Sequence, residues 1–340
     1  QDLEDPFREE FELLANTMAT NVEVFVEYPG FVKLELLNRY PGQDPKWKLP
    51  DLAYEGEAWA LFKLSVLEKN VKKCEKVDLL NREDLSQIFE RYKPDSVMHF
   101  AALSQVGESV TDPGKYWRNN VLGSLNLIEM AIKYNCLNFV FSSTCATYGD
   151  YDNVVLTERT PQSPTNSYGA SKRAVEEMIT QFAKSSGLQF VIFRYFNVAG
   201  ADPGAEIGEF HRPETHLIPL ILQVALNQRK QIYIYGDDYK TKDGTCIRDY
   251  IHIEDLADAH ISALKKGING AYNLGNGNGY SVKEVINVCR KITNHPIPSK
   301  IVPARKGDST ILIADSSKAR NELNWTPKYP DLESIILSAW

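Results

Sequence analysis

From about residue 95 onward, short apolar runs alternate with longer segments that carry helical periodicity. This order is typical of parallel strands joined by helical crossovers. No internal repeat or Gly/Ser-rich linker interrupts it, but a stretch rich in Gly, Pro and His breaks the rhythm at 197–219. The sequence therefore predicts an α/β fold, in which a doubly wound parallel sheet is followed by a smaller, less regular α/β lobe.

Periodicity also places the individual elements. We expect strands at 21–26, 96–101, 137–142 and 189–193, and helices at 120–133 and 168–184. The alternation continues, with longer loops, through segments around 217–227, 232–235, 253–266 and 282–293. In open parallel sheets, ligands bind outside the carboxyl ends of the strands. Residues directly after each strand are therefore the first candidates for chemistry.

Composition limits the kinds of partner. With 340 residues, 43% of them hydrophobic, the chain can bury a sizeable core. Its formal net charge of -7 gives no general attraction to phosphate, so we expect neither nucleic acid nor a membrane as partner.

The five cysteines are odd in number and never form a C-x-x-C pair (Cys74, Cys136, Cys145, Cys246 and Cys289). We therefore expect no disulfide framework, no metal site and a cytoplasmic location.

Three predicted strand ends carry polar side chains, at 99–102, 142–144 and 194–197. Between the last two, Tyr168 and Lys172 stand four residues apart, which stacks them on one face of a helix. This spacing alone is common in helices. The S-S-T before the helix and the R-Y-F-N after it make the combination specific, and it predicts a catalytic site.

The chemistry follows from these residue types. A tyrosine with an ordinary pKa of about 10 acts as a base near neutrality only if its phenolate is favoured, at about 1.4 kcal/mol per pKa unit. The Lys172 ammonium is placed to supply that stabilisation. The Thr144 hydroxyl can share a proton with a substrate alcohol while Tyr168 removes it. The expected site oxidises an alcohol and passes the hydride to a bound cofactor.

These motifs, together with Tyr148-Gly149 and Ser163-Pro164, resemble the extended short-chain dehydrogenase/reductases, and more narrowly the UDP-galactose (UDP-glucose) 4-epimerases. The similarity runs from about Val77 to the end of the chain, through H-F-A-A-L, R-Y-F-N-V-A-G-A, D-G-T-C-I-R-D-Y-I-H-I-E-D-L-A and R-K-G-D. It implies a Rossmann-like sheet. Residues 1–195 would form the dinucleotide-binding lobe, with 1–76 atypical, and 196–340 the substrate-binding lobe, with segments that return to the sheet.

The resemblance also implies an activity. Members oxidise the sugar C4 hydroxyl with tightly held NAD, let the 4-keto sugar turn over and return the hydride to the other face. The implied partners are UDP-glucose and UDP-galactose, and the implied assembly is a homodimer. Whether an N-acetyl group also fits the sugar pocket stays open.

Roles carry over to matching positions. Tyr168 would be the base, Thr144 its hydroxyl partner, and Lys172 the cation that tunes Tyr168 and holds the nicotinamide ribose. The other residues expected at the cofactor are Gly30, Asp78, Phe100, Ala101, Asn119, Ser142 and Tyr195. Those expected at the substrate, besides Thr144 and Tyr168, are Asn197, Arg248 and Arg305 on the diphosphate, and Asp308 on the uridine side.

Simpler roles compete with some of these. Asp78 could equally cap the amino terminus of a helix. His99, His252 and His260 are expected to be hydrogen-bonded core histidines, and Cys145 a packing residue.

The amino-terminal part departs from the family. A glycine-rich turn should follow the first strand, but 27–33 retains only Gly30, and 38–55 lacks a convincing second strand. Either a modified amino-terminal half binds NAD, or the chain is an inactive UDP-sugar-binding relative; a variant terminus is a third reading. A dehydratase or decarboxylase of the same fold is a further alternative. Cys145-Ala146 after Thr144 counts against a dehydratase, which needs an acidic pair there.

Overall fold

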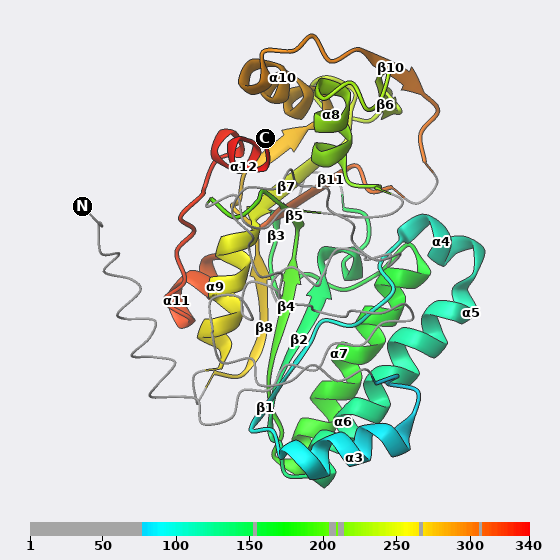
Figure 1. Ribbon diagram of the computed structural model, residues 1–340, viewed down its shortest axis with the longest axis vertical. Helices are drawn as coiled ribbons and strands as arrows, with labels where there is room; N and C mark the ends of the chain where they lie inside the picture. The colour runs from blue at the N-terminus through cyan, green and yellow to red at the C-terminus, as the bar shows by residue number, and fades with distance from the viewer. Residues whose placement is uncertain (1–76, 152–154, 204–208, 210–213, 265–267, 306–307) are drawn as a thin grey trace, which may run out of the picture.

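The computed structural model describes residues 77–151, 155–203, 209, 214–264, 268–305 and 308–340 (Figure 1). The strand expected at 21–26, Gly30 and Cys74 lie outside these residues.

The central sheet is entirely parallel. Its strands pair in the order β1 (Ser96–His99), β2 (Asn138–Thr144), β4 (Gln189–Tyr195) and β8 (Gly270–Leu274). Because β8 comes from the carboxyl-terminal half, a late segment of the chain extends the sheet that the earlier strands begin.

Helices cover both faces of this sheet, as Figure 1 shows. Successive strand side chains point to opposite faces, so Phe139 and Phe141 pack on one side while Val140 packs on the other. The first side is covered by α3 (Arg82–Tyr92), α6 (Gly123–Lys133) and α7 (Ser167–Ser186). The second is covered by α9 (Ile253–Ala263) and α11 (Ser317–Glu322). The fold is the predicted doubly wound, Rossmann-like α/β sheet.

A run of short helices leads from β1 to α6. It consists of α4 (Val106–Thr111), α5 (Pro113–Tyr116) and the π-helical η1 (Trp117–Leu122). The expected helix at 120–133 is therefore α-helical only from Gly123, and its first residues belong to the wider π-helical turn. Single π-helical turns are often found at functional sites.

The smaller lobe contains two further sheets. One has the order β3 (Val155–Leu156), β11 (Ile311–Ala314), β7 (Ile247–His252) and β5 (Asn197–Ala199), with β9 (Gly279–Ser281) antiparallel to β7. The other pairs β6 (Ile232–Tyr235) with β10 (Ser299–Val302). Three helices pack around a second core: α8 (Leu217–Ala225), α10 (Val282–Thr293) and α12 (Leu332–Ala339).

Sequence periodicity located most elements of the central sheet but missed much of the smaller lobe. Two of the alternating segments marked in the sequence, 232–235 and 282–293, coincide with β6 and α10. Strand β7 was missed because Arg248, Asp249 and His252 interrupt its apolar pattern. In the part of the chain that the structure describes, no helix has the length and apolar character needed to cross a membrane.

Asp249 on β7 ties three segments together. Its carboxylate accepts backbone N–H bonds from Asn276 (3.0 Å), Gly277 (2.9 Å) and Ala314 (3.0 Å). Gly275 must lack a side chain here, because a Cβ would lie 2.6 Å from the Asp249 Oδ2 atom. Burial raises the pKa of Asp249 to about 6, although the backbone hydrogen bonds oppose the shift. The residue therefore fixes β7, and with it Arg248, against β11.

Replacing Asp249 by Asn should lower the free energy of unfolding by about 1–3 kcal/mol, because an amide cannot accept all three bonds. The wild-type pKa is raised on folding, so the native state holds this proton more tightly than the unfolded chain. That stability is present below about pH 4 and is lost as the pH rises through about 6. The stability gap between wild type and Asp249→Asn should therefore narrow between pH 4 and 7 in denaturant titrations. A gap that widens would contradict this account.

Candidate functional site

The carboxyl ends of the central strands lie side by side. In the pairing of β2 with β4, Ser143 is opposite Arg194 and Thr144 is opposite Tyr195. His99, the last residue of β1, is opposite Phe141 on β2. The alignment of three strand ends expected from the sequence is confirmed.

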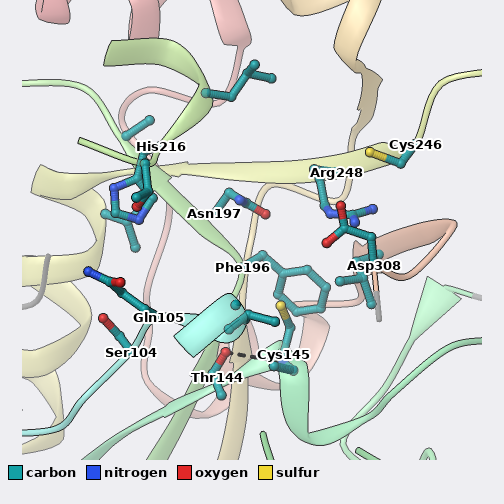
Figure 2. A pocket seen from close by; sticks show the side chains of 18 of the residues that line it. Ser104, Gln105, Thr144, Cys145, Phe196, Asn197, His216, Cys246, Arg248 and Asp308 are labelled. Atoms are coloured by element: carbon teal, nitrogen blue, oxygen red, sulfur yellow. Dashed lines mark hydrogen bonds between the residues drawn. The ribbon is translucent and has the colours of Figure 1, made fainter. Parts of the chain in front are cut away.

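These ends open into a cavity of about 840 Å³, a volume in the range of small-molecule sites. It is lined by eight of the residues predicted from the sequence: Phe100, Thr144, Tyr168, Tyr195, Asn197, Arg248, Arg305 and Asp308. Figure 2 shows Thr144 at one side of this cavity, Arg248 and Asp308 at another, and Asn197 between them. The structure therefore brings Tyr168 and Thr144 into one cavity with the predicted substrate residues.

Tyr168 reaches the cavity from the first turn of α7. Asn166 caps this helix, and its side-chain oxygen accepts a hydrogen bond from the Gly169 N–H at 2.9 Å. A Cβ at Gly169 would lie 2.4 Å from the carbonyl oxygen of Ala146. The glycine after Tyr168 thus lets the start of α7 approach the segment that follows Thr144.

Lys172 lies one turn further along α7 and is fully buried. Its Nζ donates a hydrogen bond to the Ser142 carbonyl oxygen at 2.8 Å and lies 5.0 Å from the ring centre of Phe141. Its charge also reaches His99, whose pKa is lowered to about 3, mainly by burial and secondly by Lys172. Lys172 therefore lies behind the cavity wall.

Thr144 ends β2 and begins the short 3-10 helix η2 (Cys145–Thr147). Its Oγ1 accepts a hydrogen bond from the Ala146 N–H at 3.2 Å. A hydroxyl that accepts from the backbone still has its own proton to donate. Cys145 beside it is buried, and burial raises the pKa of its thiol to about 11, as expected for a packing residue.

Two arginines lie in the smaller lobe. Half-buried Arg248 donates from Nη1 to the carbonyl oxygen of Ile247 at 2.8 Å. Exposed Arg305 stacks on Tyr235, with its guanidinium carbon 3.8 Å from the ring centre. Both line the cavity. They supply the local cations that an acidic chain needs to hold an anionic ligand.

Four other predicted residues do not line the cavity. Ser142 is buried against His260, with Oγ 3.3 Å from Nε2. Ala101 and Asn119 are half-buried, and the Asn119 amide donates to Asn120 Oδ1 at 3.1 Å. The fourth is Asp78.

Asp78 is exposed, and its Oδ1 accepts a hydrogen bond from the Leu80 N–H at 2.8 Å. The alternative that Asp78 caps a helix was wrong. Asn81 caps α3 and accepts from the N–H groups of Glu83 and Asp84. Asp78 does not cap α3 because it lies in the turn that precedes this helix.

The three histidines expected in the core are all buried. His260 stacks on Phe100 at 4.8 Å, and burial lowers its pKa to about 4. His252 is 2.8 Å from the Ser338 hydroxyl. These buried, hydrogen-bonded rings fit the packing role that was expected for them.

Among the described residues, Glu209, Glu214 and His216 form a group that could hold a metal ion. His216 Nδ1 lies 2.8 Å from Glu209 Oε1. Burial disfavours the imidazolium, but hydrogen bonds with both carboxylates outweigh it and raise the His216 pKa to about 10. The three side chains therefore form an ion-paired cluster.

Sequence reasoning missed the polar network behind the strand ends. Glu176 on α7 accepts hydrogen bonds from Arg194 Nε at 3.0 Å and Nη2 at 2.6 Å, and both side chains are buried. Asn120 bonds to both backbone groups of Leu103 and to the Ser171 hydroxyl. One sequence signal could have indicated this network: Glu176 follows Lys172 by four residues, so it lies on the same face of the helix.

Comparison with known proteins adds independent support. Residues 37–275 match the model of the NAD dependent epimerase/dehydratase family. The chain is 52% identical over 267 residues to a UDP-glucose 4-epimerase of Halalkalibacterium halodurans, which covers 77% of this chain and 80% of the relative.

The chain is also similar to solved structures of UDP-glucose 4-epimerases. A crystal structure of UDP-glucose 4-epimerase superposes with a TM-score of 0.78 at 46% identity, over 83% of this chain and 92% of the other. A second, from Bifidobacterium longum in complex with NAD+ and UDP, gives a TM-score of 0.76 at 36% identity, over 81% and 85% of the two chains.

The buried Glu176–Arg194 pair gives a stability prediction. Glu176→Ala leaves a buried guanidinium without its carboxylate and should lower the free energy of unfolding by about 3–5 kcal/mol. Glu176→Leu combined with Arg194→Met removes both charges and should recover part of that loss. Urea titrations of the two variants test this. A double variant less stable than Glu176→Ala would contradict it.

Proposed function

The chain belongs to the NAD dependent epimerase/dehydratase family, and from this premise we propose that it is a UDP-sugar 4-epimerase. It interconverts UDP-glucose and UDP-galactose through a 4-keto intermediate with tightly bound NAD. One observation carries the proposal: a single cavity is lined by Tyr168 and Thr144 and also by Arg248 and Arg305, with Thr144 and Arg248 on different sides of it (Figure 2). Two relatives named UDP-glucose 4-epimerase are 52% and 49% identical to the chain over 267 aligned residues.

The described residues fit the nicotinamide end of NAD. Parallel strand ends form the cavity floor where this fold holds dinucleotides, and Phe100 and Tyr195 line it with flat apolar surface. Lys172, Asp78, Ala101, Asn119 and Ser142 complete the proposed cofactor residues; Gly30, at the pyrophosphate, lies outside the described part. The chemistry that NAD supplies when bound is removal of the hydride from sugar C4 and its return to the opposite face.

Tyr168 is proposed as the base that takes the proton from the C4 hydroxyl and later gives it back. Thr144 donates a hydrogen bond to that oxygen, since its own oxygen already accepts from the Ala146 N–H. Lys172, one turn from Tyr168 on the same face of α7, favours the phenolate by its charge.

The polar wall binds the nucleotide. Arg248 and Arg305 are proposed to hold the diphosphate, since a guanidinium pairs bidentately with phosphate oxygens. Asn197 is proposed beside the sugar, and Asp308 on the uridine side. We assign residues 1–195 to dinucleotide binding and 196–340 to substrate binding.

The alternatives are less well supported. An inactive UDP-sugar-binding relative is not favoured, because the relatives are named epimerases and solved neighbours contain NAD. A dehydratase is disfavoured, since Thr144 is followed by Cys145 and Ala146.

We also propose a homodimer in the cytoplasm. Large apolar side chains stand exposed on the helices after β1: Val110 (51%), Trp117 (45%) and Leu122 (45%). A second copy of the chain is the proposed cover for them. Cys136, Cys145, Cys246 and Cys289 are free thiols, in keeping with a reducing compartment.

The function is tested with purified full-length protein. Denatured protein should release near-stoichiometric NAD, measured by absorbance or mass. Tyr168→Phe should abolish interconversion of UDP-galactose and UDP-glucose while leaving UDP affinity nearly intact, because the phenol acts only at the sugar.

Arg248→Met complements Tyr168→Phe, because it removes a proposed diphosphate contact and leaves the proposed catalytic residues unchanged. It should weaken UDP binding by about tenfold or more, the loss of one charge-assisted contact, as measured by calorimetry. Absence of NAD even after its addition, or unchanged turnover in Tyr168→Phe, would reject the proposal.

The dimer is tested by Trp117→Lys, which puts a charge on the proposed contact. Light scattering should show a dimer for wild type and a monomer for the variant. Leu337→Lys, at a 64% exposed position on α12, is the control and should stay dimeric. A wild-type monomer at micromolar concentration would contradict the proposal.

A further inference from the structure

Three side chains repeat along one face of α7. Tyr168, Lys172 and Glu176 are spaced by four residues, and all three are buried. This spacing places them one above the other along the face of the helix that packs against the central sheet. The catalytic tyrosine is therefore the first member of a column that continues for two further turns.

Two hydrogen bonds join this column to β2. Lys172 Nζ donates to the Ser142 carbonyl oxygen at 2.8 Å, and the Ser143 hydroxyl donates to Glu176 Oε1. Successive turns of the helix thus contact successive residues of the strand, and the next residue of the strand is Thr144. The two bonds therefore tie two turns of α7 to adjacent residues of β2, in addition to the apolar packing of Val175 and Ile179 on the sheet.

The Glu176 end of this attachment is itself held firmly. Arg194 on β4, which is paired with Ser143 in the sheet, binds the Glu176 carboxylate through Nε and Nη2. Its Nη1 donates to the Tyr148 hydroxyl at 3.1 Å, and that hydroxyl donates to Asn273 Oδ1 on β8 at 2.6 Å. The carboxylate that receives Ser143 is therefore fixed to three neighbouring strands.

We propose that Ser143 and Glu176 are positioning residues, whose hydrogen bond, with that from Lys172 to Ser142, holds α7 in register with β2 and sets the separation of Tyr168 from Thr144. The inference rests on the proposed function, since both groups must meet the same substrate hydroxyl. Misplacement of a catalytic group by about 1 Å can cost up to about 100-fold in rate.

Ser143→Ala is the decisive variant, because it removes the contact to β2 and leaves the Glu176–Arg194 ion pair in place. In the full-length protein with its bound cofactor, kcat should fall about 10- to 100-fold. The KM for UDP-galactose and the Kd for UDP should stay within about twofold, because Arg248 and Arg305 come from other elements. A merely structural serine would not separate kcat from KM in this way.

Two further variants control for stability and chemistry. Ser316 is also a buried serine, and its hydroxyl donates to the Gly275 carbonyl oxygen at 2.6 Å. Ser316→Ala should lower the Tm about as much as Ser143→Ala while kcat stays within about twofold. Ser143→Cys replaces the hydroxyl by a weak donor and should restore part of the lost kcat.

The outcomes are distinct. Wild-type kcat in Ser143→Ala, or an equal loss in Ser316→Ala, overturns the positioning role while leaving the proposed function standing. A wild-type protein without bound NAD and without turnover overturns the proposed function, and the positioning role with it.

Discussion

The burial of the Lys172 ammonium is the constraint on which the site depends. A charged group removed from water must have hydrogen-bond partners, because an uncompensated charge in the interior costs several kcal/mol. The Ser142 carbonyl oxygen meets that need at the end of β2, so α7 can pack on the sheet only where this bond forms. The same positive charge contributes to keeping His99 neutral. The position of the helix and the electrostatics behind the cavity thus have one origin.

The cavity is bounded by two parts of the fold that are built differently. The floor consists of parallel strand ends, whose register is fixed by backbone pairing, and it suits a reaction that requires accurate placement. The opposite wall consists of Arg248 on β7 and Arg305 after β10, and it suits a flexible anionic ligand. Asp249 links these two parts, because it holds β7 to β11 and to the turn after β8.

The sequence predicted those features that depend on residues close together in the chain. Tyr168 and Lys172 are four residues apart, and helical periodicity alone predicts that they share a face. Ser143, Glu176 and Arg194 could not be paired in this way, because their contacts cross from strand to helix to strand. Strand β7 escaped notice because its inward-facing residues include a buried carboxylate, which apolar patterns do not detect. Asp78 was ambiguous because Asp78 and Asn81 are both suitable caps within one turn.

The charge of the chain explains why its few cationic contacts matter. A protein with a net charge of -7 repels a nucleoside diphosphate at long range, so binding must come from contacts at close range. Arg305, which is proposed to contact the diphosphate, lies on the Tyr235 ring, and this stacking orders an otherwise exposed side chain. Arg248 is half-buried and tied to its own strand. Both guanidinium groups are therefore held in place without a ligand, which favours the diphosphate binding proposed for them.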